Sequence, residues 1–185
     1  MKPEAKFQKE VVRSLIIAGA HPVEIPDDSK KGYKFGNNVP ASPKPYDVGV
    51  LDTEGLYQAL ELKHTPGLTW NYANLEDSER NGLTAVENRG RPAWVVICFR
   101  GRLGPLQKQR LGRDVTFMDE VWAIPHWWMD QQESSGEPSF DLADSHCWGA
   151  ATYIPRLPGQ QETLWDLTPL GLNLHEPNAL LLKDL

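Results

Sequence analysis

PYDVGVLDTEGLYQALELK, residues 45–63, carries the strand and turn pattern around which the other predicted elements are arranged. Residues 48–51 favour a short β-strand, 52–55 a turn and 56–63 a second strand, so the stretch predicts a β-hairpin. This hairpin also places an Asp, a Glu and a Lys in a pattern that packing alone would not select.

Three charged side chains are expected at one end of the hairpin. Side chains of a strand alternate between faces, so Glu61 and Lys63 point to the same side. If the hairpin is symmetric about Glu54, Asp47 lies directly opposite Glu61, which brings two carboxylates and an ammonium together. A one-residue slip or a bulge would break this pairing, and the sequence leaves both open.

The remaining elements are placed by hydrophobic periodicity. A chain of 185 residues is long enough to bury a core, and an α/β (α+β) fold is expected. Apolar spacing predicts helices over 4–18 and 75–89 and strands over 21–25, 93–99 and 115–124. Residues 64–74 are expected to be irregular. The result is a central mixed β-sheet flanked by helices.

The C-terminal part is expected to be an extension, 126–185, packed on a core that covers about 4–125. Residues 126–132 are predicted to be a short helix, and 133–162 are polar and rich in loops. The apolar pieces 164–174 and 179–182 are predicted to dock back onto the core. No linker or internal repeat divides the chain, so 1–185 is expected to be a single domain.

The net charge of −6 hides a split along the chain. Residues 1–113 hold 17 of the 19 Lys and Arg and 13 of the 25 Asp and Glu, whereas 114–185 hold 2 and 12. The first part, at +4, suits a nucleic-acid partner, and the second, at −10, is expected to face solvent.

Two basic segments are candidates for contact with nucleic acid. Residues 26–46 form a long protruding loop, of a length that compact domains keep mainly for function, and a solvated, disordered loop is an equally good interpretation. The run 100–113 contains no acid, although most charge runs are only solvated. The candidate phosphate contacts in the two segments are Lys30, Lys31, Lys34, Lys44, Arg100 and Arg102.

Glu79 falls in the middle of the apolar stripe of the second predicted helix, between Leu75 and Leu83. A buried carboxylate is costly unless it is paired or binds a metal. Glu79 is therefore either in a structural ion pair or near an active site. Glu10 lies at the edge of the first helix's stripe, where a solvated or paired carboxylate is the ordinary interpretation.

Several classes of protein are disfavoured. The apolar runs are far shorter than the ~20 residues that span a bilayer, and charges interrupt the start of the chain, so neither a membrane span nor a secretory signal is expected. Cys98 and Cys147 are interpreted as free thiols of a reducing compartment. We expect a soluble cytoplasmic protein with no membrane partner, no His/Cys metal motif and no GxSxG nucleophile.

The charged face of the hairpin suits metal-assisted hydrolysis of a phosphodiester. Asp47, Glu61 and the carbonyl of Leu62 supply oxygen ligands for one or two Mg²⁺ (or Mn²⁺) ions, and a bound metal lowers the pKa of water. Lys63 would add a positive charge beside the water or the scissile phosphate. The plain alternative, a surface pair of Glu61 and Lys63 without function, leaves Glu79 unexplained.

This order of residues resembles the PD-(D/E)xK nuclease superfamily. The elements of the resemblance, over roughly residues 5–100, are Glu10 on the first helix, Asp47, the triplet Glu61-Leu62-Lys63, and a polar residue at Glu79 on the next helix. Within the superfamily the chain is similar to the Holliday-junction resolvases, of both the archaeal and the bacterial RecU type.

The resemblance implies a restriction-endonuclease-like core in which Asp47 and Glu61 bind divalent metal, Lys63 activates or orients the attacking water, and Glu10 completes the site. It implies an endonuclease that resolves four-way DNA junctions, and two matched incisions point to a homodimer. In RecU-type proteins a long segment before the hairpin enters the junction centre, and 26–46 looks like its counterpart.

The sequence departs from the family pattern in two places. Glu79 stands where RecU-type enzymes have Gln, so its part in metal or water binding is open, and Tyr46 separates Pro45 from Asp47. Two other functions stay open as well: a restriction-like or repair endonuclease on linear DNA, and a non-catalytic DNA-binding scaffold with a nuclease fold.

Overall fold

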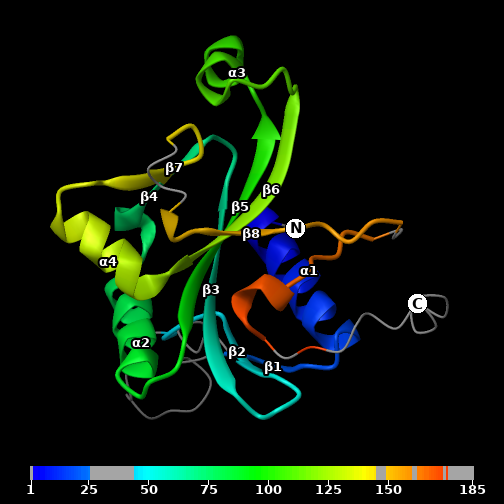
Figure 1. Cartoon of the computed structure of the whole chain (residues 1–185), viewed down its shortest axis with the longest axis vertical. Helices are drawn as coiled ribbons and strands as arrows, with labels where there is room; N and C mark the ends of the chain where they lie inside the picture. Colours follow the sequence, from blue (N-terminus) through cyan, green and yellow to red (C-terminus); the bar gives the residue numbers. More distant parts are fainter. Residues whose placement is uncertain (1, 26–43, 145–148, 160–161, 173, 175–185) are drawn as a thin grey trace, which may run out of the picture.

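The computed structural model describes residues 2–25, 44–144, 149–159, 162–172 and 174 (Figure 1). Its helices are α1 (Pro3–Ile17), α2 (Asp77–Glu87), α3 (Pro105–Leu111) and α4 (His126–Ser134), with 3-10 turns η2 (Tyr72–Asn74) and η4 (Thr168–Leu170). Its strands are β1 (His21–Glu24), β2 (Val48–Leu51), β3 (Tyr57–Thr65), β4 (Thr69–Asn71), β5 (Ala93–Arg102), β6 (Phe117–Pro125), β7 (Ser139–Asp141) and β8 (Thr152–Ile154).

Six strands form the central sheet, in the order β1-β2-β3-β5-β6-β8. β3 and β5 are parallel, and every other pair of neighbours in this sheet is antiparallel. The connection between the two parallel strands contains α2, as a parallel crossover requires. α1 covers one face of the sheet, and α2 and α4 cover the other (Figure 1). The expected fold, a mixed sheet flanked by helices, is confirmed.

Each face of the sheet has its own apolar core. On one face, Leu15 of α1 belongs to a cluster with Leu60 and Leu62 of β3. On the other, Leu83 of α2 belongs to a cluster with Ile97 of β5. Because β5 is covered on both faces, its sequence is continuously apolar rather than alternating.

The β2–β3 hairpin has the register of a turn centred on Glu54. Val48 pairs with Leu60 across the two strands. Asp47 is the residue before Val48 and Glu61 the residue after Leu60, so these two acids stand opposite each other. The predicted pairing is confirmed, without a slip or a bulge.

Asp52 and Gly55 fix the turn of this hairpin. The Asp52 carboxylate accepts hydrogen bonds from the backbone N–H groups of Glu54 (3.0 Å) and Leu56 (2.8 Å). Gly55 has a φ of +77°, a conformation that other residues adopt only with strain. The local sequence therefore sets the register that aligns the acids.

The expectation that residues 64–74 are irregular is wrong, and one helix was not predicted at all. The charged run 100–113 contains α3, and 64–74 contains the end of β3 followed by β4. β4 pairs with β7 as a separate two-stranded ribbon. These strands have three residues each, which is too short to produce a recognisable alternation.

The C-terminal part returns to the α1 face, as predicted for 164–174. The indole N–H of Trp165 donates to Glu10 Oε2 at 3.2 Å, and its backbone N–H donates to Ser14 Oγ at 2.9 Å. Residues 179–182 and Cys147 lie outside the described residues, whereas Cys98 is a buried free thiol. Within the described ranges, no helix has the length and apolar character needed to cross a membrane.

Candidate active site

Carboxylate and carbonyl oxygens gather where β2 begins. β2 starts at Val48, so the backbone N–H of Leu62 in β3 has no β2 residue as its partner. It donates to the side chain of Asp47, at 2.9 Å from Oδ2. Because the N–H and C=O of one strand residue point toward the same neighbour, the Leu62 carbonyl is directed to the same edge. The other carboxylate oxygen of Asp47 forms an ion pair with Lys44.

Lys63 is held between two glutamates. Its Nζ lies 2.8 Å from Glu61 Oε1 and donates to both carboxylate oxygens of Glu79, at 2.9 and 2.7 Å. Only 8% of Lys63 and 1% of Glu61 is exposed, so their attraction is weakly screened by solvent. The structure brings together Asp47, Glu61, Lys63 and Glu79.

Glu79 is positioned by the start of α2. Its Oε2 accepts a hydrogen bond from the backbone N–H of Glu76, the residue before the helix, at 2.9 Å. This bond satisfies one of the N–H groups that a helix start leaves free. Both interpretations of the carboxylate in the apolar stripe hold at once: Glu79 is in an ion pair, and its partner is the lysine of the candidate site.

Burial gives the charges of this cluster unusual pKa values. Burial, and then the nearby charge of Asp47, raises the pKa of Glu61 to about 9 against the opposing effect of Lys63. Burial alone would lower the pKa of Lys63, but Glu61 and Glu79 raise it above its ordinary value. Glu61 Oε2 is buried and has no hydrogen-bond partner within the described part of the chain. Such an atom costs about 1–3 kcal/mol, which a bound cation would offset.

Glu10 does not join this cluster, and the expectation that it completes the site is wrong. Its carboxylate pairs with the guanidinium of Arg100 through two contacts, at 3.0 and 2.8 Å, and accepts the indole N–H of Trp165. Lys63 points toward α2, whereas α1 packs on the opposite face. Glu10 instead joins α1 to β5, which is the paired carboxylate of the ordinary interpretation.

The first helix brings a different acid near the cluster, and sequence reasoning missed it. Burial raises the pKa of Glu4, and the charges of Asp47 and Glu79 add to this effect while Lys63 opposes it. The charges of the candidate site thus act on Glu4, whose side chain is exposed in the first turn of α1. The available signal was spacing, because Glu4 precedes the buried Phe7 by about one helical turn.

Gly82 lets the segment that carries Asp47 approach α2. A Cβ at position 82 would lie 2.2 Å from the carbonyl oxygen of Pro45, so the backbone before Asp47 packs directly on the helix. The hydroxyl groups of Tyr46 and Tyr57 hydrogen-bond to each other beside it. The position of Asp47 is therefore fixed by packing on both sides.

Of the lysines predicted in the long loop, Lys44 lies within the described residues. Residues 26–43 lie outside the described residues, and with them Lys30, Lys31 and Lys34. Lys44 pairs with Asp47, which makes it part of the acidic cluster rather than an open phosphate contact.

Arg100 is turned inward, which corrects its prediction as a contact to nucleic acid. It binds Glu10, and its Nε lies 2.6 Å from Asp119 Oδ1. Because two carboxylates hold this guanidinium, it is not free to bind a phosphate. Arg102, two residues farther along β5, is exposed.

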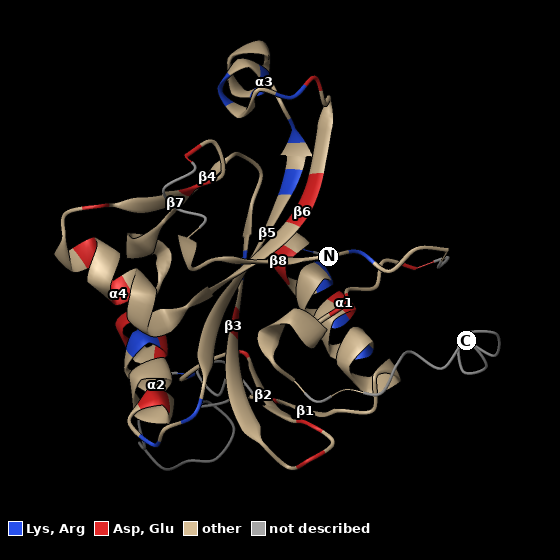
Figure 2. Cartoon of the chain, in the orientation of Figure 1, with Lys and Arg blue, Asp and Glu red and all other residues tan. Residues whose placement is uncertain are grey.

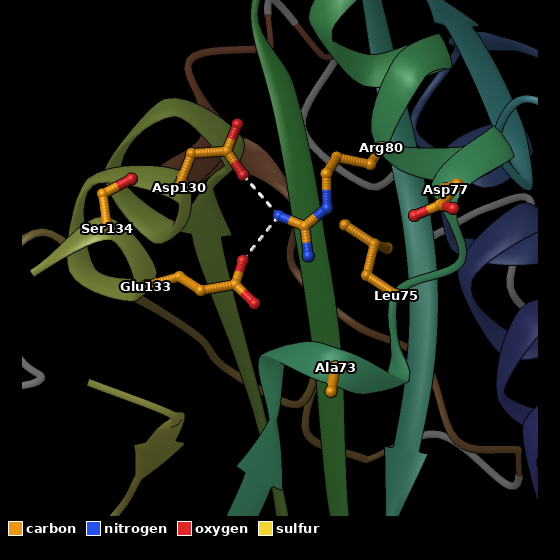
Figure 3. Close-up of a pocket in the computed structure, with 7 residues that line it drawn as sticks. All are labelled: Ala73, Leu75, Asp77, Arg80, Asp130, Glu133 and Ser134. Atoms are coloured by element: carbon orange, nitrogen blue, oxygen red, sulfur yellow. Dashed lines mark hydrogen bonds and ion pairs between the residues drawn. The ribbon is translucent and has the colours of Figure 1, made fainter. Parts of the chain in front are cut away.

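A second charged cluster lies between α2 and α4 (Figure 3). Arg80 Nη1 is 2.6 Å from Asp130 Oδ1 and 2.8 Å from Glu133 Oε2. The pocket around it has a volume of about 570 Å³ and is lined by Ala73, Leu75, Asp77, Arg80, Asp130, Glu133 and Ser134. Arg80 already engages two of its acids, so we assign the cluster to the packing of α4 on α2.

Comparison with known proteins gives a distant likeness to a solved structure, and no likeness at the level of sequence families. No protein-family model and no curated protein matches the chain. The solved structure of Hjc from Archaeoglobus fulgidus, a Holliday junction resolvase from an archaeal hyperthermophile, is similar at 21% sequence identity and a TM-score of 0.34. The match covers 49% of this chain and 63% of that chain, so it spans less than two thirds of Hjc.

Proposed function

We propose that this protein is a metal-dependent DNA endonuclease. Its active site for the hydrolysis of phosphodiester bonds is formed by Asp47, Glu61 and Lys63. The observation that carries the proposal is the meeting of two carboxylates and an ammonium where β2 begins. One oxygen of Glu61 is buried there without a hydrogen-bond partner among the described residues. A purely structural ion pair has no reason to leave that oxygen unsatisfied.

Mg²⁺, or Mn²⁺ in its place, is the cofactor that fits these ligands. Mg²⁺ usually binds proteins through one or two carboxylates and keeps several waters. Asp47, Glu61 and the Leu62 carbonyl would hold it. The backbone carbonyl is needed, because in the described ranges no three His, Cys, Asp or Glu side chains are close enough to bind a metal ion together. When bound, such an ion polarises the phosphate and lowers the pKa of water.

Lys63 supplies a fixed positive charge. Because Glu61 and Glu79 raise its pKa, Lys63 is an ammonium at neutral pH and cannot take a proton from the attacking water. Its role is to stabilise the negative charge that develops on the phosphate. Glu79 binds the ammonium with both oxygens and is the positioning residue for Lys63.

We further propose branched DNA, above all the four-way junction, as the substrate and a homodimer as the active species. The support is the sequence resemblance of Asp47 and the Glu61-Leu62-Lys63 triplet to junction resolvases. Two matched incisions also need two sites related by symmetry, which a two-fold dimer supplies. A linear-DNA endonuclease and a non-catalytic scaffold are the competing functions.

Cleavage assays test this proposal. A labelled four-way junction, a fork and a duplex of the same sequence are incubated with Mg²⁺ or with EDTA. We expect the junction to be cut into two nicked duplexes only with Mg²⁺, and Lys63→Ala to lower the rate by about 10²–10³-fold. Lys9→Ala removes an exposed lysine of α1 and is the matched control that keeps the wild-type rate.

The other possible results would favour a competing function or contradict the dimer. Equal cleavage of duplex and junction would identify an endonuclease for linear DNA. Absence of cleavage with every substrate would favour the scaffold. A monomer in sedimentation at micromolar concentration would contradict the homodimer.

A further inference from the structure

The ends of β5 and β6, together with α3, form an arm that projects from the sheet (Figure 1). β5 and β6 stay paired as far as Arg102 and Phe117. β3 ends beside Phe99, however, and β8 ends beside Val121. Residues 100–120, called the arm below, therefore extend past both neighbouring strands as a two-stranded ribbon with α3 at its tip.

The arm is braced at its base and beside α3. Gly101 packs so closely on Pro66 that a Cβ would lie 2.4 Å from the Pro66 carbonyl oxygen. Arg110 Nη2 lies 2.9 Å from Asp141 Oδ2, which ties α3 to β7. Leu103 is buried in the core on the α2 side of the sheet. The arm is thus a fixed projection that leans toward the face of the candidate active site.

The exposed charges of the arm are mainly positive. The arm holds five cations and three acids, Asp114, Asp119 and Glu120. Arg100, Arg110 and Arg113 pair with carboxylates, and Lys108 pairs with Asp114, whose side chain is 96% exposed, so this last pair is open to solvent. Figure 2 shows this basic tip at the end of the molecule where α3 lies. Arg102 has no ion-pair partner among the described residues. This surface complements a polyanion.

Two large apolar side chains lie among these cations. Leu106 is 75% exposed and Phe117 is 56% exposed. A solvated charge run gains nothing from an exposed Leu and Phe. Nucleic-acid surfaces, in contrast, combine cations for phosphates with apolar or aromatic side chains that pack on the bases.

The arm lies within one turn of duplex from the candidate active site. Glu61 pairs with Val95 of β5, and Arg102 lies seven residues farther along that strand. At about 3.3 Å per residue the separation is about 23 Å. One turn of B-DNA spans about 34 Å. A duplex placed for cleavage at Lys63 can therefore contact the arm within the same turn.

We propose that the arm is a second DNA-binding element, which holds the phosphate backbone of the duplex beside the scissile phosphate. Arg102 and Lys108 are its phosphate contacts. This inference rests on the proposed nuclease function, which gives the position of the DNA. The arm contributes affinity and register to the complex, and no group of the arm takes part in the chemistry.

The test is binding of a labelled four-way junction in EDTA, measured by fluorescence anisotropy over a range of salt concentrations. The double variant Arg102→Gln with Lys108→Gln removes two cations from the arm. Each lost phosphate contact lowers the slope of log affinity against log salt by about 0.9, so we expect a loss of about 1.8 and about ten-fold weaker binding at low salt.

The matched control removes two exposed cations at the other end of β5, through Arg89→Gln with Arg91→Gln. We expect its slope and affinity to equal those of the wild type. An equal loss in both double variants would overturn the proposal, because it would reflect net charge alone. Thermal melting of both variants verifies that they are folded before binding is compared.

The arm and the nuclease function fail separately. A reduced slope in the arm variant, with no cleavage by the wild type, would support the arm and reject the nuclease. Cleavage by the wild type with an unchanged slope would overturn the arm and keep the nuclease. Loss of the dimer in sedimentation, without a change in DNA affinity, would assign the arm to contact between copies and overturn the proposal too.

Discussion

The buried ammonium of Lys63 is stabilised by Glu61 and Glu79, and it stabilises their carboxylates in turn. In a buried ion pair the removal of one partner leaves the other charge in a poorly solvated place, which commonly costs 3–5 kcal/mol. Lys63→Ala therefore removes a charge from the proposed chemistry and also the partner of Glu61 and Glu79. Its cleavage rate has to be compared with its melting temperature, so that lost activity is separated from lost fold.

Gly82→Ala tests whether the packing of α2 on Pro45 positions Asp47. Alanine favours a helix by up to about 1 kcal/mol over glycine, so α2 itself should not suffer. The added Cβ would nevertheless meet the backbone of Pro45 at 2.2 Å, and the segment before Asp47 must move. A displacement of about 1 Å in a site can cost about 10²-fold in rate, and we expect a loss of this order in the cleavage assay.

The control for this substitution is Asn81→Ala, on the exposed side of the same helix. It gains similar helix propensity without touching Pro45 and should keep the wild-type rate. Wild-type cleavage by Gly82→Ala would show that the approach of Pro45 is not needed to hold Asp47.

For single side chains, the sequence predicted the positions that depend only on local strand and turn geometry. Alternation along β3 put Glu61 and Lys63 on one face, and a symmetric turn put Asp47 opposite. The environment of Glu10 could not be predicted in the same way, because its partner Arg100 is 90 residues away and the helix stripe does not specify it. Glu4 was missed because its spacing from Phe7 does not by itself specify which charges of other elements lie nearby.

Among the elements, the β4–β7 ribbon depends on Asp141. Its Oδ2 accepts hydrogen bonds from Thr69 Oγ1 at 2.5 Å and Arg110 at 2.9 Å, and its Oδ1 accepts the N–H of Ala143 at 2.8 Å. Burial by itself would raise the pKa of Asp141, but these hydrogen bonds lower it below the ordinary 3.8. The ionised carboxylate therefore links β4, β7 and α3.

Asp141→Asn should destabilise the protein by about 1–3 kcal/mol at neutral pH, because hydrogen bonds to a charged acceptor are lost. A group with a lowered folded-state pKa stabilises fully above its unfolded value and loses this effect as the pH falls through the folded value. The melting temperatures of variant and wild type should therefore converge as the pH falls below about 3.8.

Asp114→Asn is the matched control, since this side chain is 96% exposed and should contribute little at any pH. A constant difference between Asp141→Asn and the wild type down to the lowest pH would contradict the role of the ionised carboxylate.

α3 illustrates why some elements were not predicted. Pro105 at its start and Gly112 at its end, with a φ of +65°, are ordinary helix boundaries. The seven residues of the helix, however, carry no apolar face, and none of them is buried, so the periodicity that identified α1 and α2 is missing.

For the whole molecule, the proposed metal should act as a stabilising ligand. Burial and the charge of Asp47 disfavour the ionised form of Glu61, and a cation that binds both carboxylates offsets this cost. At 100 times its dissociation constant a ligand adds about 2.7 kcal/mol, or about 5–10 °C in a protein of this size. We expect Mg²⁺ or Mn²⁺ to raise the melting temperature in this range.

Asp47→Asn should abolish this rise, whereas Asp114→Asn should keep it. The measurement is thermal melting with each ion and with EDTA, which does not depend on any DNA substrate. No effect of either ion on the wild type would count against the metal site, and an equal rise in Asp47→Asn would place the ion elsewhere.

The contacts of Trp165 with α1 have a consequence for synthesis on the ribosome. Asp47, Glu61, Lys63 and Glu79 come from a short stretch of chain and can meet early. Ser14 and Trp165 are 151 residues apart, and at about 5–20 residues per second the tryptophan emerges roughly 8–30 s after the serine. During that interval the α1 face of the sheet lacks its C-terminal cover. Nascent chains of this protein are therefore expected to need protection from aggregation on that face more than on the α2 face.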